Sequence, residues 1–182
     1  MNKKRIFTPL RALLAALAVV VAPQILAADA VPAPDPRDVV PDQMPNFIPY
    51  GAPISAQRAQ AAIQAAAAEA AHRGWPLNIA VVDSGANLVA FLRMDGAQLA
   101  SISIAEHKAR TAAKFRRPTK AFEDGLQNKD YKYMLTLDDV IASRGGIPLV
   151  EDGKLIGAIG CSGGTGSQDQ VVCSAGAATI NK

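Results

Sequence analysis

The sequence predicts an α+β domain in which helices pack on an antiparallel sheet. The predicted elements follow the order helix, hairpin, helix, hairpin, helix along the chain. Each hairpin consists of two short apolar runs joined by a turn, which is typical of antiparallel strands. The intervening segments are alanine-rich or have apolar residues at helical spacing. Hairpins and helices segregated in this way form layered α+β sandwiches.

The first half of the domain has clear boundaries. A helix is predicted over residues 56–73, because Ser55 is a good N-cap and Gly74 a good residue just beyond the C-terminus. An apolar run at 79–82 and a second at 88–92 flank a short polar turn. These two runs predict the first hairpin.

The second half repeats this order. A second helix is predicted over residues 99–115, and Pro118 prevents its continuation. A short helix follows, and then a stretch with no firm period. Strands are predicted at 147–150 and 155–159, and a final helix at about 168–180.

Two segments precede the domain. Residues 1–28 combine a cationic start, a short apolar run and small residues, as in a secretory signal peptide. The run is too short for a comfortable membrane span, so no span is expected after signal removal. Residues 29–53 hold seven of the twelve prolines and predict an extended linker. The domain is therefore expected at 54–182, and the protein in the periplasm or secreted.

The basic charge of the chain comes from the expected signal peptide. The formal net charge is +3 and the isoelectric point about 9.0. Removal of Lys3, Lys4, Arg5 and Arg11 leaves 15 basic and 16 acidic residues, a net charge of −1. The mature domain therefore lacks the basic excess of a nucleic-acid-binding protein.

Cys161 and Cys173 are the two cysteines of the chain. An oxidising compartment permits a disulfide between them. Bonding depends on the distance and direction of the two side chains, so the sequence leaves both a disulfide and two separate thiols open.

Ser103, His107 and Thr111 are the main candidate ligand residues. Their four-residue spacing puts them on one face of the second helix, roughly opposite its apolar residues. That face should point away from the core. An imidazole is a common iron or zinc ligand, whereas threonine is a weak ligand. One histidine is too few for a closed zinc site, but haem needs a single protein ligand and an apolar slot. The alternative is a solvated face.

The end of the same helix is rich in cations. Glu106 can pair with Arg110 at four-residue spacing. The other cations at this helix end, Lys114 among them, could bind carboxylates such as haem propionates, or they could form a solvated basic face. Six residues make up this cluster: Lys108, Arg110, Lys114, Arg116, Arg117 and Lys120.

A glycine-rich loop precedes the final helix. Its residues are Gly163, Gly164, Thr165 and Gly166. Backbone N–H groups at a helix N-terminus attract anions, so the loop is a candidate anion site. No lysine follows the glycines, which argues against a nucleotide P-loop. The plain alternative is a tight turn in which Ser167 or Asp169 caps the helix.

Two blocks carry a resemblance to a known family: V-D-x-G-x-x-L, and G-A-I-G-x-S-G-G followed by Q-D. Over about residues 54–180 the chain resembles the GlcG/HbpS family of haem-binding or haem-degrading domains. The resemblance implies an α/β/α sandwich of the profilin-like kind, with a five-stranded sheet and helices on both faces. It also implies homo-oligomers, often octamers. Where a haem site is described in the family, a helix residue is the ligand. The Lys-Ala-Arg-Thr-Ala run matches Thr111 to that position, with His107 one turn earlier as its rival.

Three functional hypotheses follow. The first is an exported haem-binding protein, acting in haem uptake, storage, degradation or redox sensing, with haem as cofactor. The second is a binder or enzyme for a small organic acid, of the glycolate type, that uses residues 163–166. The third is a structural oligomer without a ligand. No catalytic triad or G-x-S-x-G elbow marks an enzyme, so catalysis stays open.

Overall fold

The computed structural model describes residues 40, 42–44 and 48–181. The chain divides into two units, Met1–Asp42 and Gln43–Lys182, and the second holds the helices and strands described below. The expected signal peptide at 1–28 lies outside the described residues, as does most of the expected linker at 29–53. Within the described ranges, no helix is both long enough and apolar enough to cross a bilayer.

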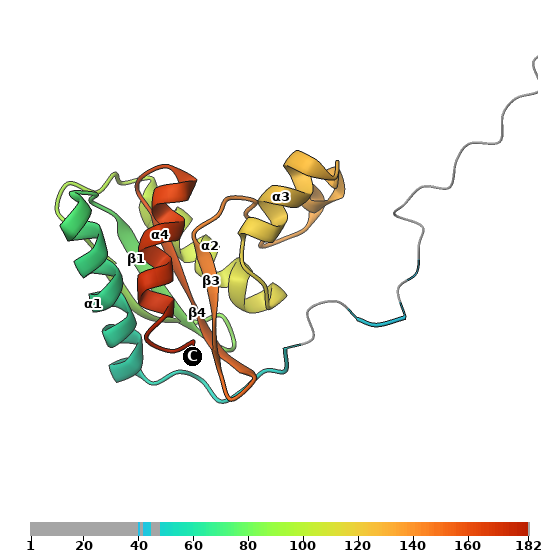
Figure 1. The fold of residues 1–182 in the computed structure, drawn as a ribbon, viewed down its shortest axis with the longest axis horizontal. Helices are drawn as coiled ribbons and strands as arrows, with labels where there is room; N and C mark the ends of the chain where they lie inside the picture. Colours follow the sequence, from blue (N-terminus) through green and yellow to red (C-terminus); the bar gives the residue numbers. More distant parts are fainter. Residues whose placement is uncertain (1–39, 41, 45–47, 182) are drawn as a thin grey trace, which may run out of the picture. The chain divides into compact units, whose positions relative to one another are not determined.

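The described part of the chain folds into an α+β domain (Figure 1). The helices are α1 (Ala56–Arg73), α2 (Ser101–Phe115), α3 (Lys120–Asn128), the 3-10 helix η2 (Lys132–Thr136) and α4 (Gly166–Ala177). The strands are β1 (Asn78–Asp83), β2 (Leu88–Arg93), β3 (Gly146–Glu151) and β4 (Lys154–Ser162). They form one antiparallel sheet in the order β2-β1-β4-β3. The α+β class is confirmed.

The expected fifth strand is wrong for the described residues, where an isolated bridge stands in its place. Tyr50 pairs in parallel with Leu155 at the start of β4. The N–H of Gly51 donates to the carbonyl of Leu155 (2.7 Å), and the N–H of Leu155 donates to that of Pro49 (2.8 Å). Pro49 and Pro53 have no N–H to donate, which limits the hydrogen bonds that this segment can add to the ladder.

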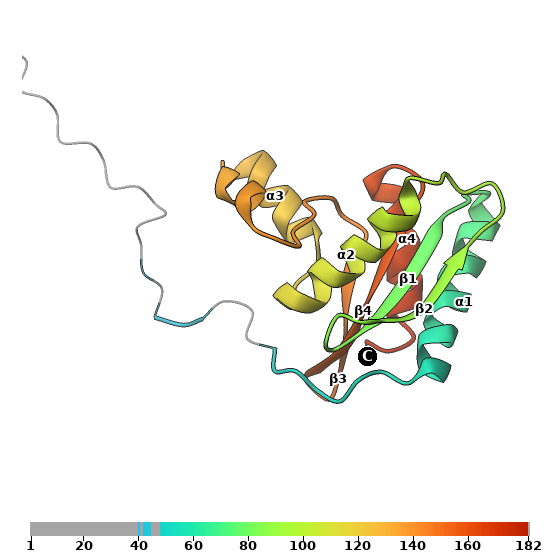
Figure 2. The same cartoon turned by 180° about the vertical axis from the view of Figure 1, so that it is seen from behind.

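Helices cover both faces of the sheet (Figures 1 and 2). Along β1, Ile79 and Val81 belong to the core under α1 and α4, whereas Ala80 and Val82 belong to the core under α2. Successive side chains of a strand point to opposite faces. The continuous apolar run therefore marks a strand buried on both sides.

Helix α2 lies unusually close to the sheet because small residues meet at the contact. A Cβ added at Gly160 of β4 would lie 2.1 Å from the carbonyl oxygen of Ala105 and 2.5 Å from the nitrogen of Ala109. Such distances are far below contact, so glycine is required there. This contact fixes α2, and with it the helix face that carries His107.

The helix boundaries follow their caps. Helix α1 begins and ends as expected, with the Ser55 hydroxyl accepting from the N–H of Arg58 and Gly74 at φ +68°. Thr165 caps α4 and forms a capping box with Gln168. The expectation that Ser167 or Asp169 caps this helix is therefore wrong. Thr165 has the extended backbone of an N-cap, so α4 begins at the next residue.

The segment without a firm sequence period separates α3 from β3. Helix α3 projects at the end of the domain beside α2, away from α1 (Figures 1 and 2). Helix η2 follows it, and residues 137–145 then run irregularly to β3. We call residues 137–145 the strap, because they bind α2 on their way back to the sheet.

Candidate functional site

The candidate face of α2 runs from solvent into the interior. Ser103 is exposed, His107 is partly exposed and Thr111 is 0% exposed. The expectation of a face turned away from the core therefore holds at Ser103 and is wrong at Thr111. The physical reason is the strap, which covers the C-terminal half of the face.

Thr111 has both roles of its hydroxyl group satisfied by the strap. Its Oγ1 donates to the carbonyl oxygen of Asp139 at 2.6 Å and accepts from the N–H of Ile141 at 3.1 Å. Asp139 adopts a left-handed φ of +60°, which turns the backbone carbonyl toward the helix. In this arrangement Thr111 holds the strap, and a metal would have to displace the strap to reach it.

His107 has the opposite character. Its Nε2 atom is buried, and it has no hydrogen-bond partner among the described residues. Nearly all buried polar side-chain atoms in folded proteins have a partner. The imidazole nitrogen is a type of atom that commonly binds iron, and a ligand would reach it once the groups that cover it move.

Two cations, Lys114 and Arg110, act on Asp139 beside this histidine. The ammonium of Lys114 hydrogen-bonds its carboxylate and holds the pKa of Asp139 below the usual value, and His107 and Arg110 lower it further. Arg110 itself donates to Glu106 at 3.1 Å, as the spacing predicts. Both cations next to His107 thus have carboxylate partners on a partly exposed surface.

The six cations of the α2 end do not form one basic face. Lys108 is 1% exposed and turns inward. Arg116 donates to the carbonyl of Ile48 at 3.2 Å and lies 5.2 Å over the Tyr50 ring. Lys120 pairs with Asp124. The expected anion-binding cluster is therefore divided among several environments.

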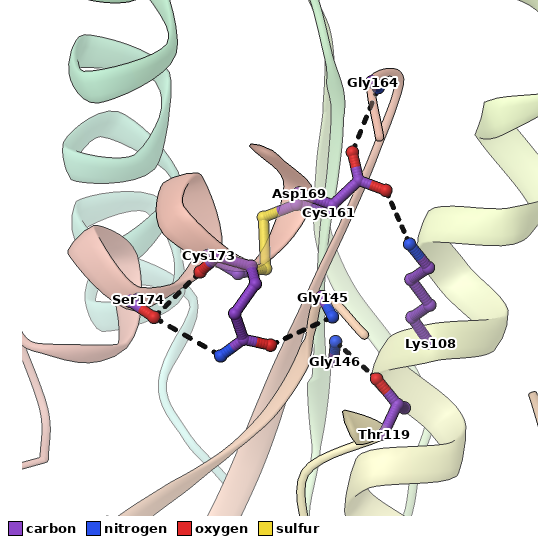
Figure 3. Close-up of a disulfide and its surroundings, with 10 residues drawn as sticks. Lys108, Thr119, Gly145, Gly146, Cys161, Gly164, Asp169, Cys173 and Ser174 are labelled. Carbon is purple, nitrogen blue, oxygen red and sulfur yellow. Dashed lines mark hydrogen bonds and ion pairs between the residues drawn. A yellow bond between two sulfur atoms is a disulfide. The ribbon is translucent and has the colours of Figure 1, made fainter. Parts of the chain in front are cut away.

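The glycine-rich loop already binds a carboxylate of the chain itself (Figure 3). The N–H of Gly164 donates to Oδ1 of Asp169 at 3.0 Å, and Nζ of Lys108 lies 2.6 Å from Oδ2. The N–H of Thr165 donates to Oε1 of Gln168 at 2.8 Å. Burial raises the pKa of Asp169, while Lys108 and the loop amides act in the opposite direction. An external anion would have to displace these side chains.

Sequence reasoning missed the pairing of Lys108 with Asp169. The sequence pattern presents Asp169 as a possible cap and Lys108 as one cation in a run. The one local feature that bears on the pair is the position of Asp169 at the start of a helix, after glycines. A polar residue at such a position normally faces solvent, so the pattern does not reveal a buried partner.

Cys161 and Cys173 form a disulfide, which resolves the two alternatives left open by the sequence. Their Cα atoms are 5.6 Å apart, and the bond joins β4 to α4. Cys173 lies one helical turn after Asp169, so the disulfide and the buried ion pair hold the same side of α4 (Figure 3).

His107 does not belong to a closed metal site in the described part of the chain. Within the described residues, no three His, Cys, Asp or Glu side chains cluster as a metal site. A metal held by His107 would therefore need further ligands of its own, as porphyrin iron has.

Comparisons with known proteins agree with this architecture. Residues 54–178 match the family model described as "Haem degrading protein HbpS-like". Protein GlcG of Escherichia coli K12 is 42% identical over 109 residues, which cover 60% of this chain and 81% of GlcG. An uncharacterized 15.0 kDa protein of Citrobacter freundii is 36% identical over 124 residues, covering 66% of this chain and 87% of that protein.

Solved structures extend the comparison to the fold. A crystal structure of HbpS has a TM-score of 0.68 at 28% identity and covers 77% of this chain and 99% of HbpS. A crystal structure of a PduOC:haem complex has a TM-score of 0.66 at 30% identity and covers 71% of this chain and 96% of PduOC. With the family match over most of the domain, these similarities show that the chain belongs to the HbpS-like family, the GlcG/HbpS family that its sequence resembles.

Proposed function

We propose that this protein is an exported haem-binding protein whose ligand face is the outer side of α2. The observation that carries the proposal is the buried, unpartnered Nε2 of His107. The haem complex of the similar PduOC and the haem-degrading description of the family support haem as the ligand class. Bound haem would supply an iron centre, and the chain would ligate it and limit its contact with water.

Between the two rival ligands, the geometry favours His107. Thr111 donates to and accepts from the strap, so ligation would cost two hydrogen bonds and require the strap to move. His107 would gain a partner for a buried atom that has none, and satisfying such an atom is favourable. We therefore propose that His107 ligates the iron and that Thr111 holds the strap.

The neighbouring charges suit the carboxylates of haem. Arg110 and Lys114 follow His107 by three and seven residues, which puts both on the same side of α2. Their present partners, Glu106 and Asp139, form partly exposed pairs. Such pairs contribute about 0–1 kcal/mol each, so exchanging a carboxylate for a propionate costs little. Ser103, one turn before His107, is exposed and would line the outer edge.

Assembly and location belong to the same proposal. A ligand lying on the outer face of α2 would be covered from one side only, whereas small-molecule sites bury most of the ligand surface. A second copy of the chain would supply the other side, which supports a homo-oligomer such as an octamer. The Cys161–Cys173 disulfide and the signal-like N-terminus support a periplasmic or secreted location.

The test is a hemin titration of the mature apo protein, followed by the Soret band and by electron paramagnetic resonance of the ferric iron. His107→Ala should weaken the Soret band and change the resonance spectrum. The other histidine of the chain, His72 at the end of α1, provides the matched control, and His72→Ala should leave both signals unchanged. An unchanged spectrum in His107→Ala would exclude this residue as the ligand, and equal losses in both variants would indicate adventitious haem.

The organic-acid alternative has less support from the structure. Two amides of the loop formed by residues 163–166 donate to Asp169 and Gln168. A small carboxylate would therefore compete with carboxylate and amide groups that are already in place.

A further inference from the structure

A cavity lies between α3 and η2, and none of the candidate haem residues lines it. Its volume is about 570 Å³. Three cations (Arg117, Lys120 and Lys129) and one carboxylate (Asp124) belong to its lining, together with Tyr131 and Met134. This combination of charged and apolar walls is typical of a ligand site.

The charges of the lining favour an anion. Lys120 pairs with Asp124, with Nζ and Oδ2 2.5 Å apart. Nε of Arg117 donates to the carbonyl of Phe115 at 3.3 Å, and Lys129 lies 6.0 Å from the centre of the Tyr131 ring. A carbonyl and an aromatic ring stabilise a cation without neutralising it. The cavity therefore has a positive excess on its rim.

Part of the lining is apolar or aromatic. Met134 is 7% exposed and packs against α3 where Gly125 leaves room. A Cβ added at Gly125 would lie 2.9 Å from Cε of Met134. The rings of Tyr131 and Tyr133 lie 5.7 Å apart, which extends the aromatic surface along η2. A thioether and aromatic rings accept apolar or planar groups.

We propose that this cavity binds an organic anion with an aromatic or apolar body and one acidic group, such as a carboxylate, sulfonate or phosphate ester. The acidic group lies among Arg117, Lys120 and Lys129, and the body lies against Tyr131 and Met134. The inference does not depend on haem binding, since different residues in another part of the domain carry it.

The test uses two fluorescent probes with the same apolar body. Anilinonaphthalene sulfonate carries an acidic group, and the neutral phenylnaphthylamine does not. The sulfonate should bind the mature protein and the neutral probe much more weakly. Arg117→Gln and Lys129→Gln should each weaken sulfonate binding by roughly tenfold, because each removes a charge-assisted contact. Lys154→Gln, in the β3–β4 hairpin, is the matched charge control and should have no effect.

A substitution that should tighten sulfonate binding distinguishes the loss of a binding contact from the loss of the fold. Asp124→Asn removes the carboxylate that competes for Lys120 and should tighten sulfonate binding by roughly threefold. Sulfonate binding that is the same in all cavity variants would overturn the site. Equal binding of the two probes, or full competition by inorganic phosphate at the same concentration, would overturn the ligand class. The hemin signal should persist in Arg117→Gln and Lys129→Gln, so the two proposals fail separately.

Discussion

Lys108 and Asp169 form a buried ion pair between helices on opposite faces of the sheet. Nζ of Lys108 in α2 lies 2.6 Å from Oδ2 of Asp169 in α4, and the two side chains are 1% and 3% exposed. The pair passes the end of the sheet at Gly145, where an added Cβ would lie 2.8 Å from Cβ of Asp169 and 3.2 Å from Nζ of Lys108. It therefore links α2, the glycine-rich loop and α4 into one unit.

Loss of one member of this pair should be strongly destabilising. Lys108→Met removes the cation and leaves the Asp169 carboxylate buried without its charge partner. Breaking a buried pair in this way costs about 3–5 kcal/mol. We expect a loss of this size in the free energy of unfolding, measured by urea denaturation at neutral pH.

The double variant identifies the cause of that loss. Lys108→Met with Asp169→Asn removes both charges and keeps an acceptor for the N–H of Gly164, so it should recover part of the stability. Lys154→Met, at an exposed position, controls for the substitution itself. A cost below about 1 kcal/mol for Lys108→Met would contradict the structural role of the pair.

The disulfide should contribute measurably to stability. Cys161 and Cys173 close a loop with a sequence separation of 12. The chain-entropy relation for a loop of this length gives about 3 kcal/mol. We expect reduction by dithiothreitol to lower the urea midpoint of the wild-type protein accordingly. The variant with Ala at both positions should start at the lower midpoint and be insensitive to the reductant, and sensitivity in that variant would assign the effect elsewhere.

Thr111→Val should loosen the strap and leave the fold intact. The substitution keeps the shape and removes the acceptor for the N–H of Ile141 and the donor to Asp139. Loss of such a bond costs about 1–2 kcal/mol, so exchange of the Ile141 amide should accelerate by roughly tenfold in hydrogen exchange. The amide of Gly146, bound to the hydroxyl of Thr119, is the internal control. An unchanged rate at Ile141 would show that other contacts hold the strap.

Much of the fold could be predicted from local patterns, and the misses have a common cause. The hairpins and α1 follow from short apolar runs, turn residues and the Ser55 and Gly74 caps, which act within a few residues. The buried state of Thr111 depends on Asp139, 28 residues away, and that of Lys108 on Asp169, 61 residues away. The sequence has no periodic pattern that points to Asp139 or Asp169 as the partner. The missing fifth strand likewise depends on the register between residues 49–54 and β4.

The candidate site could likewise be predicted only where local spacing determines it. Four-residue spacing correctly placed Ser103, His107 and Thr111 along one side of α2, and it correctly paired Glu106 with Arg110. Exposure along that side could not be predicted, because the strap has no pattern that reveals where it packs. Spacing therefore identified the candidate residues, and tertiary contacts decided how far each of them is exposed.

The ion pair of Glu123 with Arg144 should make the anchoring of the strap sensitive to acid. Glu123 accepts from the backbone N–H of Arg144 at 2.7 Å and from its Nε at 2.8 Å. These bonds, with the side-chain bond first, hold the pKa of Glu123 below its usual value. A carboxyl with a lowered pKa contributes stability that is fully present above its unfolded pKa, about 4.3, and is lost as the pH falls through the lower folded pKa.

Glu123→Gln should therefore cost about 1–2 kcal/mol of unfolding free energy at pH 7, and the difference from wild type should shrink as the pH falls below about 4. Urea denaturation at both pH values measures the change. Glu69→Gln, in the α1 surface pair with Arg73, is the matched control and should cost less than about 0.5 kcal/mol. In acid, a protonated glutamic acid and a glutamine are nearly equivalent at this position. If the difference for Glu123→Gln persisted undiminished at low pH, packing rather than charge would therefore account for it.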